Sequence, residues 1–279
     1  MSLVVEPHPE IPFASICSGV DLAVAPELAA RQISTVIAER PLLLLPEQDL
    51  SPDQQLELSK ALGEPERSWD RKSLHPDNPY IQVIESGKRP PGVKSTSQVW
   101  HTDQSFVEHP PSLTILHARQ VPSEGGETLF ADMTAALESL SPARRKELGP
   151  LHGIHSYEHL LGPVRADRYS SDLVEDETQL YKPVRHPLVR RNVRSGRLAL
   201  YMNQLCLSRI EELDPVTSDR MLKDLYDVVL DHDRVRGHRW HVGDVLIWDN
   251  ASLMHRGSPA ATDEPRQLHR TTVSGERPV

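Results

Sequence analysis

A histidine and a carboxylate stand two residues apart at His101 and Asp103, and a second histidine, His255, lies far downstream after a Trp-Asp-Asn segment. In an extended segment, side chains two residues apart project from the same face, so His101 and Asp103 could bind one metal ion. Two imidazoles and one carboxylate form the facial set that holds Fe(II) and leaves coordination positions open, as oxygen activation requires. The sequence therefore predicts His101, Asp103 and His255 as metal ligands.

The His-x-Asp spacing alone is not specific. His75 and Asp77 have the same spacing but lie in a Pro-Asn-Pro segment, which is typical of a turn. We interpret that pair as turn residues. Because the predicted triad already supplies the metal, we expect packing, turn or solvent roles for six further histidines: His109, His117, His152, His155, His159 and His186.

A second cluster of interest contains Arg266 and Arg270, four residues apart and close after His255. A dicarboxylate that chelates iron through a 2-oxo acid needs a planar, permanently charged partner for its far carboxylate, and arginine supplies one. Two arbitrary arginines would more often be solvated surface charges. Their position after the predicted metal ligands favours co-substrate binding.

The order of motifs resembles the taurine dioxygenase and phenoxyacetate dioxygenase family of 2-oxoglutarate enzymes. The motifs are Trp-His-Thr-Asp at 100–103, Gly-Gly-Glu-Thr at 125–128, Trp-Asp-Asn before His255, and the arginine pair. The resemblance implies Fe(II), 2-oxoglutarate and dioxygen as cofactors, with release of succinate and CO2. It also implies that Thr128 donates its hydroxyl to the distal carboxylate of 2-oxoglutarate beside Arg266. Arg270 matches the arginine that lies between the co-substrate and an anionic primary substrate.

Two local departures bear on the substrate. Taurine-using members have a histidine that helps hold a sulfonate where this chain has Ser68, which disfavours taurine. Gln104-Ser105-Phe106 is closer to the phenoxyacetate branch. The intact Asp103 argues against the related halogenases, which have a small residue there. Hydroxylation is the usual outcome in the family, while desaturation, ring expansion and epoxidation share the same oxidant, so the outcome and the primary substrate stay open.

Two alternatives differ in class. A jelly-roll metalloenzyme that does not use 2-oxoglutarate would not need Thr128 or Arg266. A non-catalytic, cupin-like binding protein could keep a vestigial metal pocket, but the intact triad and the arginine pair argue against it.

The elements that must position these residues follow from periodicity. Apolar residues at helical spacing predict a helix over 26–40, Leu42–Leu45 is typical of a buried strand, and Ser51-Pro52 opens a helix that ends near Gly63. Helices are also expected over 133–148 and 218–230. Short strands are predicted at 80–84, 112–118, 188–190, 197–202, 239–241, 245–248 and 270–273. Many short strands favour a mainly β fold, a double-stranded β-helix (jelly roll, cupin-like) with flanking helices.

The chain of 279 residues suits a single domain over 1–279, in which the polar stretch 158–185 is expected to be a lid or loop excursion. A net charge of -9 and few aromatic residues argue against nucleic acid, and no segment has the length of a membrane span. The two cysteines, Cys17 and Cys206, have no metal-type spacing, and the N-terminus lacks a secretory signal pattern. We expect a cytoplasmic enzyme with a small-molecule substrate, an anionic one being favoured by Arg270; a homo-oligomer is compatible with the sequence.

Overall fold

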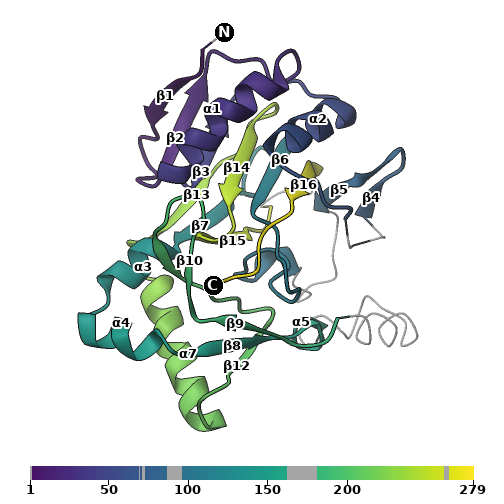
Figure 1. The fold of residues 1–279 in the computed structure, drawn as a ribbon. Helices are drawn as coiled ribbons and strands as arrows, with labels where there is room; N and C mark the ends of the chain where they lie inside the picture. The colour runs from purple at the N-terminus through teal and green to yellow at the C-terminus, as the bar shows by residue number, and fades with distance from the viewer. Residues whose placement is uncertain (1, 69, 71–72, 87–95, 162–180, 261–263) are drawn as a thin grey trace.

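The computed structural model describes residues 2–68, 70, 73–86, 96–161, 181–260 and 264–279 (Figure 1). Its largest element is an eight-stranded sheet with the strand order β1-β2-β3-β14-β6-β16-β5-β4, in which only β2 and β3 pair in parallel. The strands of this sheet are β1 (Val4–Pro7), β2 (Ala14–Ser18), β3 (Leu42–Leu45), β4 (Leu74–His75), β5 (Asn78–Ser86), β6 (Leu113–Gln120), β14 (Val245–Asp249) and β16 (Arg266–Val273).

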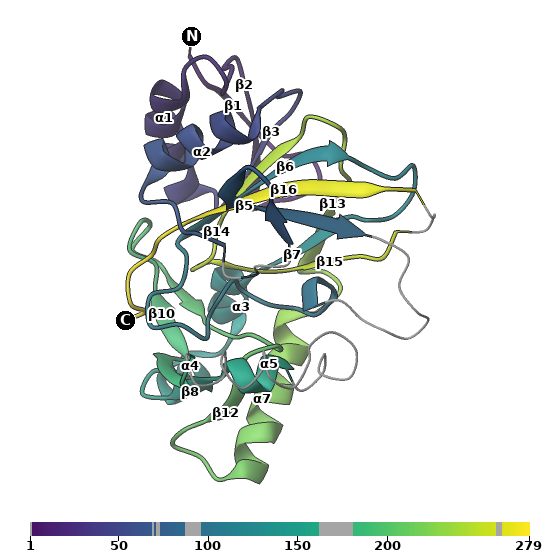
Figure 2. The same cartoon turned by 90° about the vertical axis from the view of Figure 1, so that its right-hand side faces the viewer.

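A three-stranded antiparallel sheet lies across one face of the large sheet (Figure 2). It has the order β13-β7-β15, formed by β13 (Val235–His238), β7 (Thr128–Asp132) and β15 (Leu253–Gly257). Phe130 of β7 and Leu253 of β15 share one buried cluster with Leu116, Trp248 and Leu268 of the large sheet. A mainly antiparallel large sheet that faces the three-stranded sheet across this shared core confirms the predicted jelly roll.

Side-chain alternation gives the large sheet two different faces. On β3, Leu42 and Leu44 belong to the core between the sheets, whereas Leu43 and Leu45 belong to the cluster beneath the N-terminal helices. Successive strand residues point to opposite faces, so a strand buried on both sides is apolar throughout. This explains the continuous leucine run from which the strand was predicted.

Two helices cover the outer face of the large sheet (Figure 1). Helix α1 (Pro26–Glu39) ends just before Pro41, and α2 (Pro52–Leu62) begins with a capping box in which Ser51 and Gln54 exchange hydrogen bonds. The first backbone N–H groups of a helix have no partner within the helix, so a proline there loses no hydrogen bond. Pro26 and Pro52 therefore favour the starts of α1 and α2. The predicted helices over 26–40 and from Ser51 to Gly63 are confirmed.

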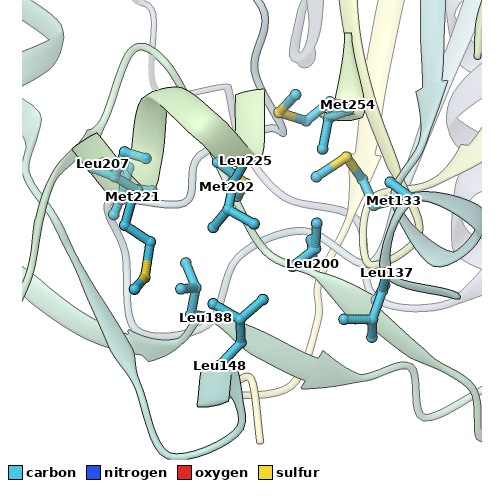
Figure 3. Packing of buried hydrophobic residues seen from close by; sticks show 14 of the residues in the cluster. Met133, Leu137, Leu148, Leu188, Leu200, Met202, Leu207, Met221, Leu225 and Met254 are labelled. Carbon is cyan, nitrogen blue, oxygen red and sulfur yellow. The ribbon is translucent and has the colours of Figure 1, made fainter. Parts of the chain in front are cut away.

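A third layer of helices and small sheets packs behind the three-stranded sheet. Its apolar cluster joins Met254 of β15 to Met133, Leu200 and Leu225 (Figure 3). The helices are α3 (Met133–Ser139), α4 (Pro142–Leu148), α5 (Tyr157–Leu161) and α7 (Pro215–Val229), and the short 3-10 helix η2 (Thr96–Gln98) precedes the predicted metal ligands in sequence. The small sheets contain β8 (His152–His155), β9 (Val184–Pro187) and β12 (Leu207–Ile210), and the pair β10 (Val189–Arg191) and β11 (Leu198–Leu200).

The structure corrects several predicted elements. The helix expected over 133–148 is two helices, because Ser141 caps a new helix at Pro142. The strand expected at 239–241 is wrong: the strand in this region is β13, which ends at His238 and contains Gly237, a residue that weakens the local strand signal. Polar strands such as β8 and β9 were not predicted, since they lack apolar alternation. Of the excursion expected over 158–185, residues 162–180 lie outside the described residues.

Within the described part of the chain, no helix combines the length and the apolar character that crossing a membrane needs.

Candidate metal centre

Three side chains from distant parts of the sequence converge between the two sheets. One donor atom each from His101, Asp103 and His255 lies within 4.8 Å of the other two. Oδ1 of Asp103 lies 3.9 Å from Nε2 of His101 and 3.8 Å from Nε2 of His255. Among the described residues, this is the only group of three or more histidine, cysteine or acidic side chains with such convergence.

The backbone explains how the three residues meet. His255 lies on β15, and its backbone pairs with that of His101 through two hydrogen bonds of 3.0 and 2.8 Å. Asp103 begins a turn, and Gln104 after it has a φ of 47°, a left-handed conformation that side chains rarely adopt. The segment is thus extended only at His101, and the turn directs the Asp103 carboxylate back toward both imidazoles.

The protonation of His101 suits a metal ligand. Its Nδ1 lies 2.7 Å from the Val99 carbonyl oxygen, which can only accept a hydrogen bond, so Nδ1 carries the proton. The lone pair is therefore on Nε2, which faces Asp103 and His255. Burial lowers the pKa of His101. Burial, with a smaller effect from the neighbouring His101 ring, lowers the pKa of His255 to about 3. Both rings are therefore neutral near pH 7.

Asp103 is charged despite its burial. Burial alone would raise its pKa, but the Arg270 guanidinium, the two imidazoles and the Thr114 hydroxyl outweigh that effect and hold the pKa well below its usual range. Nη2 of Arg270 lies 2.8 Å from Oδ1, and the Thr114 hydroxyl donates to Oδ2 over 2.5 Å. A neutral imidazole pair with one carboxylate is the protonation state that a divalent cation requires.

The donor set fits a first-row divalent ion. Such ions bind imidazole nitrogen and carboxylate oxygen at roughly 2.1 Å, so two donors on one ion are at most about 4.2 Å apart. Both measured separations from Asp103 Oδ1 fall within that limit. The tautomer of His101 and the ionised Asp103 agree with the same assignment.

Arg270 lies between the metal ligands and β5. Its Nη1 donates to Oε1 of Gln82 over 2.6 Å, and Gln82 in turn donates to Ser73 over 3.1 Å. These contacts fix the guanidinium beside Asp103. Gln82 gave no functional signal in the sequence, because it is a polar residue on a strand and only the pairing of β16 with β5 places it opposite Arg270.

The second arginine, Arg266, lies four residues away on the same face of β16 and is buried. Its Nε donates to the Gly126 carbonyl over 2.9 Å. Gly126 has a φ of 73°, which favours glycine, and a β-carbon there would lie 3.0 Å from Cδ of Arg266, so the arginine side chain would have to shift. Burial lowers the pKa of Arg266 to about 10, which still leaves it charged at neutral pH.

Thr128 begins β7, two residues after Gly126, and is buried. Its Oγ1 accepts a 3.0 Å hydrogen bond from the Trp240 indole, so the hydroxyl proton is left for another acceptor. The structure thus brings Arg266 to the segment that carries Thr128. Trp240 was missed from the sequence, where it lay in a wrongly predicted strand.

The remaining candidates are structural or exposed. His75 accepts a 3.2 Å hydrogen bond from the Asp77 backbone, the local turn contact expected for that pair. His117 contacts the Gln48 carbonyl at 3.1 Å on the outer side of β6. Thr114 is a further residue that sequence reasoning missed: its hydroxyl donates to Asp103, and Asn250 donates to Thr114, contacts that only the folded structure reveals.

Comparison with known proteins identifies the family of the chain. The family model described as "Taurine catabolism dioxygenase TauD, TfdA family" matches residues 6–272. The chain is 32% identical over 292 residues to the alpha-ketoglutarate-dependent 2,4-dichlorophenoxyacetate dioxygenase of Cupriavidus pinatubonensis, covering 98% of both proteins. It is 29% identical to the alpha-ketoglutarate-dependent sulfate ester dioxygenase of Pseudomonas putida, covering 79% of this chain and 72% of that one.

A solved structure has the same fold. The crystal structure of AAD-2 in complex with Mn(II) and N-oxalylglycine superposes with a TM-score of 0.80 at 26% identity, covering 99% of each chain. The match extends over the whole chain, so it includes both sheets and the strands that carry the candidate metal ligands.

Proposed function

The chain belongs to the TauD, TfdA family of dioxygenases, and from this premise we propose that His101, Asp103 and His255 hold its Fe(II). The family activity is an oxidation that uses Fe(II), 2-oxoglutarate and dioxygen. The observation that carries the assignment of residues is the convergence of two neutral imidazole nitrogens on one oxygen of an ionised carboxylate.

We further propose that Arg266 and Thr128 bind the distal carboxylate of 2-oxoglutarate. A buried guanidinium is stabilised by an anionic partner, and the carboxylate of a dicarboxylate can accept paired hydrogen bonds from it. Thr128 has its hydroxyl proton available because its oxygen already accepts from Trp240. Arg266 and Arg270 lie on one face of β16, so both ends of the co-substrate would meet a positive charge.

When bound, Fe(II) supplies the redox chemistry by which 2-oxoglutarate and dioxygen give succinate, CO2 and an oxidised substrate carbon. The residues of the chain place the reactants. Asp103 stays ionised and the imidazoles neutral, Arg270 offers its charge to an anionic group beside the metal, and the apolar side chains between the sheets exclude water. Such placement is the contribution a protein makes when a cofactor carries the reaction.

The substrate that these residues suit is a small organic anion, and the reaction is its hydroxylation. The relatives named above act on a phenoxyacetate and on sulfate esters, and both substrate types carry an anion. Arg270 is the buried cation nearest the metal ligands and would bind that group. Ser68 lacks the charge that a histidine offers to a sulfonate, which disfavours taurine.

The buried, unpaired thiols Cys17 and Cys206 also support a cytoplasmic location, which we propose from the cysteine pattern.

A substrate screen tests this function. Purified protein with Fe(II), ascorbate and 2-oxoglutarate is offered phenoxyacetates, alkyl sulfates and taurine, each beside a neutral analogue of equal size, and succinate release is measured with the product mass. We expect an anionic substrate to stimulate succinate release and to gain one oxygen. Stimulation by neutral analogues as strong as by the anions would contradict the assigned role of Arg270.

A further inference from the structure

Four buried side chains form a continuous hydrogen-bond chain that ends on the metal-facing carboxylate. The Trp248 indole Nε1 donates to Oδ1 of Asn250 over 3.0 Å. Nδ2 of Asn250 donates to Oγ1 of Thr114 over 2.9 Å, and Thr114 donates to Oδ2 of Asp103 over 2.5 Å. All four residues are less than 6% exposed, so water does not compete for these contacts.

The direction of every bond in this chain follows from its first member. An indole N–H can only donate, so the oxygen of the Asn250 amide must face Trp248 and its nitrogen must face Thr114. The Thr114 oxygen therefore accepts from Asn250, and its single proton is free to be donated to Asp103. An ionised carboxylate can only accept, which closes the chain without conflict.

The result is that the two oxygens of Asp103 differ. Oδ2 accepts a hydrogen bond from the Thr114 hydroxyl, whereas Oδ1 lies near Nε2 of both His101 and His255 and 2.8 Å from Nη2 of Arg270. A carboxylate that used both oxygens on one ion would occupy a further coordination position. A carboxylate held at Oδ2 leaves that position for the co-substrate or dioxygen.

We propose that Asn250, fixed by Trp248, is a positioning residue that acts through Thr114 to keep Asp103 a one-oxygen metal ligand. This inference rests on the proposed function, because it requires Asp103 to be a ligand. Asn250 also contacts the ligand segment from its other side, since the Thr102 hydroxyl donates to the Asn250 carbonyl over 2.9 Å. Asn250 therefore links the turn between β14 and β15 to the segment that carries His101 and Asp103.

The chain offers a matched control for Thr114. Thr271 lies on the neighbouring strand β16, is equally buried, and shares a 2.7 Å hydrogen bond with the Ser59 hydroxyl on the outer face of the sheet. Thr114→Val and Thr271→Val each remove one buried hydroxyl at nearly constant volume. Only Thr114 is connected to Asp103, so a general loss of stability would affect both variants alike.

The test is a titration of the whole protein with Co(II), without substrate or turnover. Calorimetry measures the affinity, and the visible absorption of the bound ion reports its coordination number. We expect Thr114→Val and Asn250→Leu to weaken Co(II) binding by about 10- to 100-fold, the usual effect of losing an outer hydrogen-bond partner, and to alter the spectrum. Thr114→Ser should restore both, and Thr271→Val should leave both unchanged.

The outcomes separate the two hypotheses. If wild-type protein binds Co(II) through Asp103, as judged by loss of binding in Asp103→Ala, but Thr114→Val has wild-type affinity and spectrum, the positioning role is wrong and the metal assignment stands. Equal changes in Thr114→Val and Thr271→Val would also overturn the positioning role. If Asp103→Ala binds Co(II) like wild type, the proposed metal centre itself is wrong.

Discussion

His101 with His255 and His155 with His186 are two pairs of neighbouring histidines in the described part of the chain, and only the first pair faces a carboxylate. The rings of His101 and His255 have centroids 4.3 Å apart, and those of His155 and His186 have centroids 5.2 Å apart. Burial lowers the pKa of all four, so each ring is neutral near pH 7. Proximity and neutrality therefore do not distinguish the pairs.

What differs is the partner of each ring. The first pair faces Oδ1 of Asp103, whereas His155 contacts the Ser105 hydroxyl at 2.9 Å. His186 donates from Nε2 to the carbonyls of Ser105 and Val107, both at 3.0 Å. Among the described acidic residues, none converges with the second pair. The carboxylate between the first two imidazoles creates the candidate metal site, whereas His155 and His186, with neutral partners, stabilise the turn that follows Asp103.

The largest difference between the pairs should appear on removal of single residues. We expect His101→Ala, Asp103→Ala and His255→Ala each to reduce substrate-dependent succinate formation at least about a thousandfold, or by roughly 4 kcal/mol of barrier. His155→Gln should retain turnover within about an order of magnitude. Assays of purified, folded variants check this, and substantial turnover in all three triad variants would refute the assignment.

The next largest effect concerns the co-substrate. Arg266→Ala should weaken 2-oxoglutarate binding by roughly 30-fold or more, because truncating a buried, charge-assisted pair typically costs at least 2 kcal/mol. The KM for 2-oxoglutarate, measured at saturating substrate, should rise accordingly. Gln267→Ala, which changes a partly exposed neighbour on β16, is the control. Equal KM values in Arg266→Ala and wild type would remove Arg266 from the site.

A third prediction separates stability from binding. His186→Ala leaves the buried carbonyls of Ser105 and Val107 without their donor and opens a small cavity, so we expect a loss of about 2–3 kcal/mol in the free energy of unfolding. Metal affinity should change less than about threefold, because His186 makes no hydrogen bond to a proposed metal ligand. Urea denaturation and metal titration of the same preparation check both parts. A large fall in affinity with little change in stability would reverse the roles of the two pairs.

The smallest expected effect is a pH dependence. The pKa of His186 is about 4 in the folded protein and 6.5 in the unfolded chain, because burial disfavours the charged ring. The unfolded chain therefore takes up this proton first as the pH falls, and stability is lost below about pH 6.5 until the pKa of about 4 is reached. Between pH 7 and 5.5 this group should cost about 1 kcal/mol of folding free energy. His186→Gln should show a shallower loss over that range, and an unchanged slope would contradict the pKa.

The convergence of His101, Asp103 and His255 could be predicted from residue types and spacing because it depends on few side chains, and the family motifs suggested the roles proposed for Thr128 and Arg266. The contacts that support the triad could not be predicted. Thr114 lies on β6 and Asp103 in a turn outside the large sheet, so their hydrogen bond depends on how that turn packs against the sheet.

In the fold, too, elements with a strong local signal could be predicted, and elements determined by tertiary pairing could not. The buried leucine strand β3 and the proline-capped helices were predicted, since each has a strong local signal. The strand placed at 239–241 was wrong, because β13 contains Gly237 and is selected by its pairing with β7 rather than by its own pattern. Short polar strands of the third layer have no apolar alternation at all, so tertiary packing determines them.

The most direct test of the central claim is an anaerobic titration with Fe(II) in the presence of 2-oxoglutarate, followed by the visible absorption of the ferrous keto acid chelate. We predict saturation at a single ion per chain in wild type and in His155→Gln, and no chelate band in Asp103→Ala. Retention of the wild-type band and stoichiometry in Asp103→Ala would show that the iron binds elsewhere and would contradict the account.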